Sequence, residues 1–134
     1  MDNFKRIPYD PPMEICKTLQ VGNIVFLSGN EGLEPGPGRR VADTIEGQVA
    51  TVVRKMSEAL QEHGLTLANM VRHTIYLKKD AADPIYVLSL FHNECYKYAP
   101  ELKNFPSTGT IVVIERLVIE EFMIEVESIA AIPE

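Results

Sequence analysis

The chain has 134 residues, of which 46% are hydrophobic and 24% are charged, and its formal net charge is −6. This length and apolar content predict one domain over residues 1–134 with a buried core. The acidic balance argues against a protein that mainly binds nucleic acid or an anionic membrane surface, because both rely on clusters of Lys and Arg.

The N-terminal segment, residues 1–13, contains three prolines and predicts an extended stretch with at most one edge strand. It lacks the apolar stretch of a secretory signal, and no run in the chain approaches the roughly 20 apolar residues of a membrane span. The two cysteines, Cys16 and Cys95, form no disulfide framework. We therefore expect reduced thiols, no membrane association and a cytoplasmic location.

A β-hairpin is predicted next. Residues 15–21 and 24–27 have the composition of strands, and Gly22-Asn23 between them suits the positive φ values of a tight turn. The second strand is expected to end at residues 28–30. The glycines and prolines that follow, up to residue 38, do not match a phosphate-binding loop and predict an ordinary connection.

Two amphipathic helices are expected. The first begins after Asp43 or Thr44 as N-cap and ends at Gly64, and the second begins at Pro84 with Asp83 as N-cap. The apolar stripe of the first helix comprises Ile45, Val49, Val52, Val53, Met56, Ala59 and Leu60. The buried side of the second comprises Val87, Leu90, Phe91 and Glu94 or Cys95.

Three further strands are predicted at residues 70–78, 108–114 and 122–132, because polar and apolar residues alternate or β-formers dominate there. In the first of these, Val71, His73, Ile75 and Leu77 are expected on one face, and Arg72, Thr74, Tyr76 and Lys78 on the other. The last strand places Glu125 and Glu127 on an otherwise apolar face, roughly 6.5–7 Å apart. That face is therefore either open to water or lines a site that uses a carboxylate.

The order β-β-β-α-β-α-β-β predicts an α+β fold, with a six-stranded sheet and both helices on one face. The other face is left bare, so we expect self-association and ligand clefts between subunits. The three histidines share no metal-ligand spacing, and His92 with Cys95 would supply only two ligands, so no metal site is expected. Arg39 and Arg40 either solvate a loop or lie over the mouth of a site.

A group of hydroxyls, Ser107, Thr108 and Thr110, surrounds Gly109 at the start of a predicted strand. Glycine lets a ligand approach the backbone closely, and hydroxyls with free N–H groups can hold a carboxylate. The β-propensity of threonine explains the same pattern equally well.

These elements together resemble the Rid/YjgF family, whose type members are trimeric enamine/imine deaminases and which includes endoribonuclease L-PSP-like proteins. The resemblance rests on Val21-Gly22-Asn23, Val25-Phe26, Ser28-Gly29, Gln48, Ala59-Leu60, Gly64-Leu65, Val71, Thr74, Tyr76-Leu77, Asp83, Phe105-Pro106, Ile124-Glu125, Glu127 and Ile129-Ala130. It implies a mixed sheet of the chorismate-mutase-like (YjgF) fold. It also implies a homotrimer with inward-facing sheets, small-molecule clefts between subunits and no cofactor.

The resemblance also implies a site. Glu127 takes the place of the glutamate that handles the hydrolytic water, and Ser28 with Gly29 lies in the substrate pocket. The family's substrate-binding arginine corresponds to Thr108 or Gly109, followed by a backbone N–H at Gly109 or Thr110. Its tyrosine corresponds to Ile15 and its asparagine to Leu88. This pocket is therefore expected to be more apolar and less charged than usual for the family.

Two hypotheses follow. In the first, the protein hydrolyses an imine, an enamine or a related metabolite, with Glu127 handling water and Ser28 and Thr108 holding the substrate. In the second, the trimer clefts bind a small metabolite or a protein partner without turnover, since the arginine is missing. RNA cleavage, a third activity attached to relatives, is disfavoured by the acidic charge.

Overall fold

The structure is a computed structural model that describes residues 3–38 and 40–134. The elements in chain order are β1 (Lys5–Pro8), β2 (Cys16–Val21), β3 (Ile24–Glu31), α1 (Ile45–Gln61), η1 (Leu67–Asn69), β4 (Met70–Lys78), α2 (Pro84–Tyr98), η2 (Pro100–Lys103), β5 (Thr108–Ile114) and β6 (Ile124–Ala131). The predicted order of strands and helices is confirmed. The two η elements are short 3-10 helices in connections that the sequence predicted as loops.

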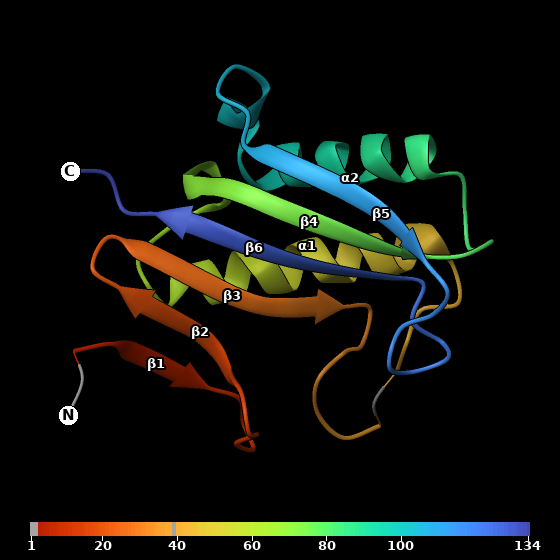
Figure 1. The fold of residues 1–134 in the computed structure, drawn as a ribbon, viewed down its shortest axis with the longest axis horizontal. Coiled ribbons are helices and arrows are strands. Elements are labelled where there is room, and N and C mark those ends of the chain that lie inside the picture. Colours follow the sequence, from red (N-terminus) through yellow and green to blue (C-terminus); the bar gives the residue numbers. More distant parts are fainter. Residues whose placement is uncertain (1–2, 39) are drawn as a thin grey trace.

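The six strands form one sheet in the order β1-β2-β3-β6-β4-β5. All neighbours are antiparallel except β4 and β5, which are parallel, so the predicted mixed sheet is confirmed. Both helices lie on the same face of this sheet (Figure 1). The last strand, β6, is central, which explains the regular alternation of buried and partly exposed residues along it.

The β2–β3 hairpin turns at Gly22, whose φ of +57° favours glycine, and Val21 pairs with Ile24 as predicted. The second strand is longer than predicted and runs to Glu31. A register shift between Leu27 and Asn30 absorbs the intervening residues, so β3 keeps its pairing with β6 beyond them. This bulge contains two of the predicted site residues.

The core lies between the sheet and the helices. Every residue of the predicted α1 stripe is buried, as are Val87, Phe91 and Cys95 of α2. Gln48 of α1 is fully buried and polar. Its Nε2 donates to Ala42 O at 2.8 Å and to Glu121 O at 2.9 Å, while its Oε1 accepts from Met123 N at 2.8 Å. Gln48 thereby fastens α1 to the segment that enters β6.

One residue of β4 faces the wrong way relative to the prediction. Val71 was expected on the buried face but is 43% exposed, whereas Met70 is 4% exposed. The β4–β6 register shifts between Met70 and Arg72, so the strict alternation that predicted a buried Val71 fails at this end of the strand.

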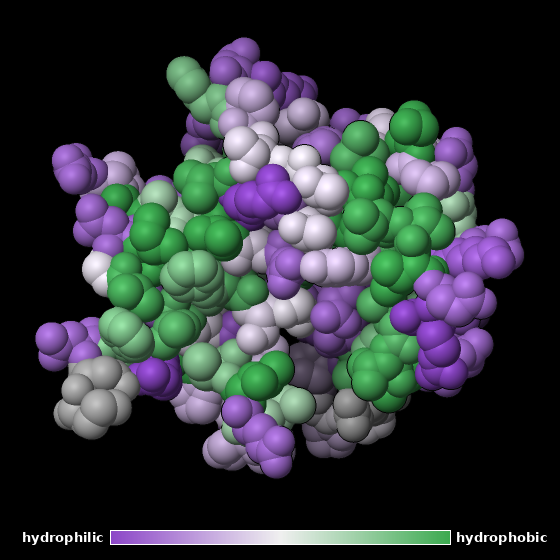
Figure 2. All heavy atoms as spheres, viewed as in Figure 1, coloured by the Kyte–Doolittle hydropathy of each residue, from purple (hydrophilic) through white to green (hydrophobic). Residues whose placement is uncertain are grey.

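The sheet face without helices is the open face. Figure 2 shows two groups of apolar residues on it, separated by a hydrophilic band. Exposed apolar side chains on or beside the sheet strands include Phe4, Phe26, Val71, Val112, Val113, Val118 and Ile119. The trimer that would cover this face remains a prediction. Within the described residues, no helix combines the length and the apolar character needed to cross a membrane.

Candidate functional site

Glu127 lies on the open face of β6 and is exposed, so the sequence-based assignment of its face is confirmed. Its Oε1 accepts a hydrogen bond of 2.6 Å from Tyr76 Oη on β4. The register sets Glu127 opposite Thr74 on β4, and Thr74 opposite Thr110 on β5. A polar row therefore crosses three strands, with about 10 Å between its two ends.

Arg72 provides a cation beside this row. Arg72 is opposite Ile129 on β6, which makes it a diagonal neighbour of Glu127, with Cα atoms roughly 7–8 Å apart. Its Nη2 donates to Thr110 Oγ1 at 2.9 Å. The alternation of β4 predicted this face for Arg72, but the sequence offered no reason to assign it a role.

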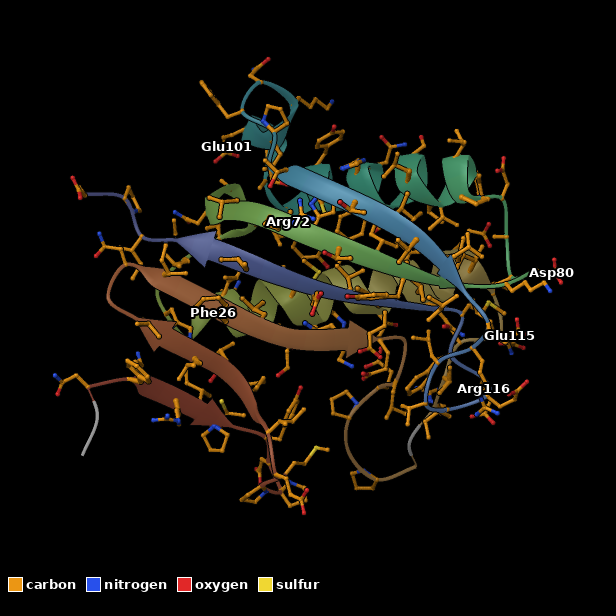
Figure 3. All side chains as sticks on the ribbon, in the orientation of Figure 1. Phe26, Arg72, Asp80, Glu101, Glu115 and Arg116 are labelled. Atoms are coloured by element: carbon orange, nitrogen blue, oxygen red, sulfur yellow. The ribbon has the colours of Figure 1, made fainter. Side chains whose placement is uncertain are left out.

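Arg72 and Glu127 line the same shallow hollow of about 200 Å³. The other residues that line this hollow are Phe26, Leu27, Thr74, Ser128 and Ile129. Figure 3 shows Arg72 on β4 and Phe26 on β3, with β6 running between these two strands. The hollow is thus lined by one carboxylate and one guanidinium, and its other lining residues are uncharged.

Ser28 lies in the β3 bulge, where its Oγ donates to Cys16 O at 2.7 Å. Tyr9 lies close by. Burial and the charge of Glu31 raise the pKa of Tyr9, and a hydrogen bond with the Ser28 side chain opposes that shift. Tyr9 was missed because nothing in the N-terminal segment marks it as a partner of β3. Ile15, at the position that the resemblance assigns to a tyrosine, is 58% exposed just before β2.

Gly29, also in the bulge, packs directly against Glu125. A Cβ atom at Gly29 would lie 2.1 Å from Glu125 Oε2, so a larger residue here would require the Glu125 side chain to move. Burial, followed by the charges of Glu31 and Glu127, raises the pKa of Glu125. Lys55 opposes the shift, and it forms an ion pair of 2.8 Å with Glu31.

Three of the remaining predicted residues, Leu88, Gly109 and Thr110, line a different cavity, of about 360 Å³, between α2 and β5. It is lined by Met70, His73, Leu88, His92, Cys95, Tyr96, Leu102, Pro106, Ser107, Gly109, Thr110 and Ile111. Thr108 does not line it; its hydroxyl donates to Val71 O at 2.6 Å. We call this space the α2–β5 cavity.

The structure therefore does not gather the predicted site residues in one place within a single chain. Ser28 and Gly29 lie on β3, Thr108 to Thr110 on β5, and the two strands are separated by β6 and β4. Three strand spacings amount to about 14 Å. Glu127, on β6, lies between the two groups.

The sequence placed two arginines, Arg39 and Arg40, in the loop after β3. Arg40 is exposed and its carbonyl accepts from Glu34 N at 2.8 Å, while Arg39 lies outside the described residues. Among residues 3–38 and 40–134, no three His, Cys, Asp or Glu side chains are grouped so that they could hold a metal ion.

Comparison with known proteins matches the family model described as Endoribonuclease L-PSP to residues 12–132. A curated relative, Reactive Intermediate Deaminase A of Arabidopsis thaliana, is 33% identical over 117 residues, or 87% of this chain. The matched region spans only 57% of that relative's length.

Solved structures show the same fold. The conserved Rid family protein YyfA of Yersinia pestis superimposes with a TM-score of 0.76 at 23% identity, covering 96% of this chain and 99% of that one. Escherichia coli TdcF, solved with bound serine, superimposes with a TM-score of 0.71 at 19% identity, covering 96% and 94%.

Proposed function

The chain belongs to the Endoribonuclease L-PSP family, that is, to the Rid/YjgF group, and on this basis we propose that it hydrolyses a small imine or enamine. The observation that carries the proposal is Glu127, held by Tyr76 in a hollow that also contains Arg72. A deaminase name for the Arabidopsis relative supports the reaction class, although that protein is nearly twice as long as the matched region.

In this reaction Glu127 acts as the general base. Its carboxylate takes a proton from water as the water oxygen adds to the imine carbon. The C–N bond then breaks, ammonia leaves with the transferred protons, and a carbonyl compound remains. Tyr76 donates to one carboxylate oxygen, which orients the group and leaves the other oxygen for the water.

Arg72 is the group we propose for an anionic end of the substrate. A guanidinium can bind a carboxylate through two parallel N–H···O bonds. Here the hydrogen bond to Thr110 engages only one of the N–H donors of Arg72. This assignment gives the site a cation although the resemblance sets Thr108 or Gly109 at the place of the family's arginine. The serine bound to TdcF is an example of a small carboxylate ligand on this fold.

A homotrimer with ligands in the clefts between subunits is part of the proposal. The predicted residues fall about 14 Å apart on one sheet, and a cleft shared by two copies would bring the β3 group of one against the β5 group of the other. The exposed apolar residues of the open face also favour such packing.

The test measures release of ammonia and 2-oxo acid from imines that an amino acid oxidase generates in solution from amino acids and O2. Wild type is compared with Glu127→Gln, and with Glu115→Gln as a matched control at an exposed position outside the hollow. We expect at least a hundredfold loss for Glu127→Gln, and a raised KM with little change in kcat for Arg72→Gln. Equal rates for wild type and Glu127→Gln would overturn the proposed hydrolysis. Light scattering tests the proposed homotrimer by measuring the number of subunits.

A second candidate function is a trimer that binds a small metabolite without turnover. It is favoured by the absence of a charged side chain at Thr108 and by the hydrogen bond that already engages Arg72. Thermal stabilisation by 2-oxobutyrate or benzoate, with no product from any imine, would support this alternative over hydrolysis.

A further inference from the structure

Glu125 is a second carboxyl group on the open face, and the hydrolysis described above does not use it. It is half-buried and lies two residues before Glu127 on the same face of β6. The bulge of β3 places Gly29 at the level of Glu127. Oε2 of Glu125 lies so close to Gly29 that a Cβ atom there would be only 2.1 Å away. The Glu125 carboxyl therefore leans along the strand toward Glu127.

The surroundings of Glu125 disfavour its ionised form. Glu31 is directly opposite on β3, and like charges in such a pair repel each other. The Lys55 ammonium donates to Glu31 Oε1 at 2.8 Å, to Glu31 O at 3.0 Å and to a carbonyl of the following loop at 2.9 Å, so its three N–H groups are engaged. Tyr76, opposite on β4, donates to Glu127 instead. Neither of these two donors therefore serves the Glu125 carboxyl.

The two neighbouring carboxyl groups differ in environment. Burial, followed by the charges of Glu31 and Glu127, raises the pKa of Glu125. The phenols of Tyr9 and Tyr76 also face Glu125, and both are neutral at pH 7 because each has a pKa above 10. Glu127, in contrast, is exposed and accepts a hydrogen bond. Carboxyl groups with such different surroundings are suited to opposite roles, one as proton donor and the other as proton acceptor.

We propose that Glu125 is a catalytic acid of the hydrolysis, paired with Glu127 as the base. This role rests on the proposed function. Glu125 gives its proton to the imine nitrogen while the water oxygen forms its bond to the imine carbon, and Glu127 takes a proton from that water. The product of this first half is a carbinolamine, with Glu125 ionised and Glu127 protonated.

The second half of the reaction reverses the two roles. Glu127 returns its proton to the nitrogen, and Glu125 takes the proton of the new hydroxyl group. The electrons of that O–H bond form the C=O bond as the C–N bond breaks and ammonia leaves. Glu125 is then protonated and Glu127 ionised, as at the start, so the two side chains together supply and recover every proton.

The test records kcat/KM against pH for wild type and Glu125→Gln, with Glu94→Gln as a matched control. Glu94 is likewise half-buried, but it lies on α2 and pairs with Lys97. We expect the wild-type rate to fall on the alkaline side as Glu125 loses its proton. Glu125→Gln should be about a hundredfold slower at pH 6 and should lack this fall. Its resistance to urea should not decrease, because glutamine removes the repulsion with Glu31.

Glu31→Gln distinguishes an acid from a merely structural residue. The charge of Glu31 is, after burial, the main cause that raises the pKa of Glu125, and its loss also frees the Lys55 ammonium. The alkaline fall should therefore move to lower pH rather than disappear. Carbon-13 NMR of the Glu125 carboxyl should show the same displacement of its titration without any substrate.

The acid role is overturned, with hydrolysis intact, if the alkaline fall persists in Glu125→Gln or stays at the same pH in Glu31→Gln. Equal rates for wild type and Glu127→Gln would instead overturn the hydrolysis and the acid role with it. Should Glu125→Gln fail to fold, the pH profile of Glu31→Gln and the carboxyl titration decide the matter.

Discussion

Tyr76 and Glu127 form a diagonal pair across β4 and β6. The register sets Tyr76 opposite Glu125 and Glu127 opposite Thr74, yet Tyr76 Oη reaches past its direct neighbour and donates to Glu127 Oε1 at 2.6 Å. Glu127 is thereby flanked by a phenol on one diagonal and by Arg72 on the other. The phenol fixes the carboxylate on a surface that would otherwise leave it free to rotate.

Removing the phenol hydroxyl is expected to slow hydrolysis without abolishing it. Tyr76→Phe should lower kcat about tenfold, because Glu127 keeps its charge but loses its orientation. The hydrogen bond to Glu127 raises the pKa of Tyr76, so the phenol should lose its proton above pH 10. Phenolate absorbance measured against pH follows the deprotonation of Tyr76. This deprotonation should move back towards pH 10 in Glu127→Gln and should be absent in Tyr76→Phe. An identical titration of wild type and Glu127→Gln would contradict the pairing.

Two glycines give a matched test of close packing. A Cβ at Gly109 meets the buried ring of His73, whereas a Cβ at Gly29 meets the end of the Glu125 side chain. A flexible carboxylate can move aside more easily than a buried ring can. Gly109→Ala should therefore cost about 1–3 kcal/mol of unfolding free energy, and Gly29→Ala less. Urea unfolding of both variants measures the difference, and the reverse order would show that the His73 ring is free to shift.

Gln48 is expected to be the most sensitive polar position in the core. Its replacement by leucine keeps the approximate volume but leaves Ala42 O, Glu121 O and Met123 N without their partner. We expect a loss of about 3 kcal/mol or more, since each unpaired buried group costs about 1–3 kcal/mol. Chemical unfolding of Gln48→Leu, with exposed Gln61→Leu as control, makes the comparison. Similar stabilities for the two variants would rule out this fastening role.

The neutral ring of His73 makes stability depend on pH. Its pKa is about 4 in the folded chain and 6.5 in a free histidine, so the unfolded chain binds the proton first as the pH falls. The stabilisation is complete above pH 6.5 and is lost between pH 6.5 and 4, by up to about 3 kcal/mol. Urea unfolding at pH 7, 5 and 4 should show a smaller decline for His73→Gln than for wild type. Parallel declines would mean that His73 titrates normally in the fold.

Most of the fold followed from periodicity, because a sheet with one covered face and two amphipathic helices imprints clear patterns on β6 and α1. The exposure of Val71 was not predicted, because a bulge is set by pairing with a distant strand rather than by local sequence. The residues of the candidate site were harder to predict for the same reason. Glu127 was recognisable as a carboxylate among apolar neighbours. Arg72 and Tyr9 could be assigned a role only once the fold had placed Arg72 beside β6 and Tyr9 beside β3, which are distant from them in the sequence.

The central position of β6 has a consequence for how the protein is made. Ile24 pairs with Ala131 and Leu77 with Ile124, so β3 and β4 emerge from the ribosome long before the strand that joins them. Until then each presents an unsatisfied backbone edge, which is the kind of surface through which nascent chains aggregate. Molecular chaperones that shield such edges should therefore increase the yield of folded protein, and the gain should arise during translation rather than after it.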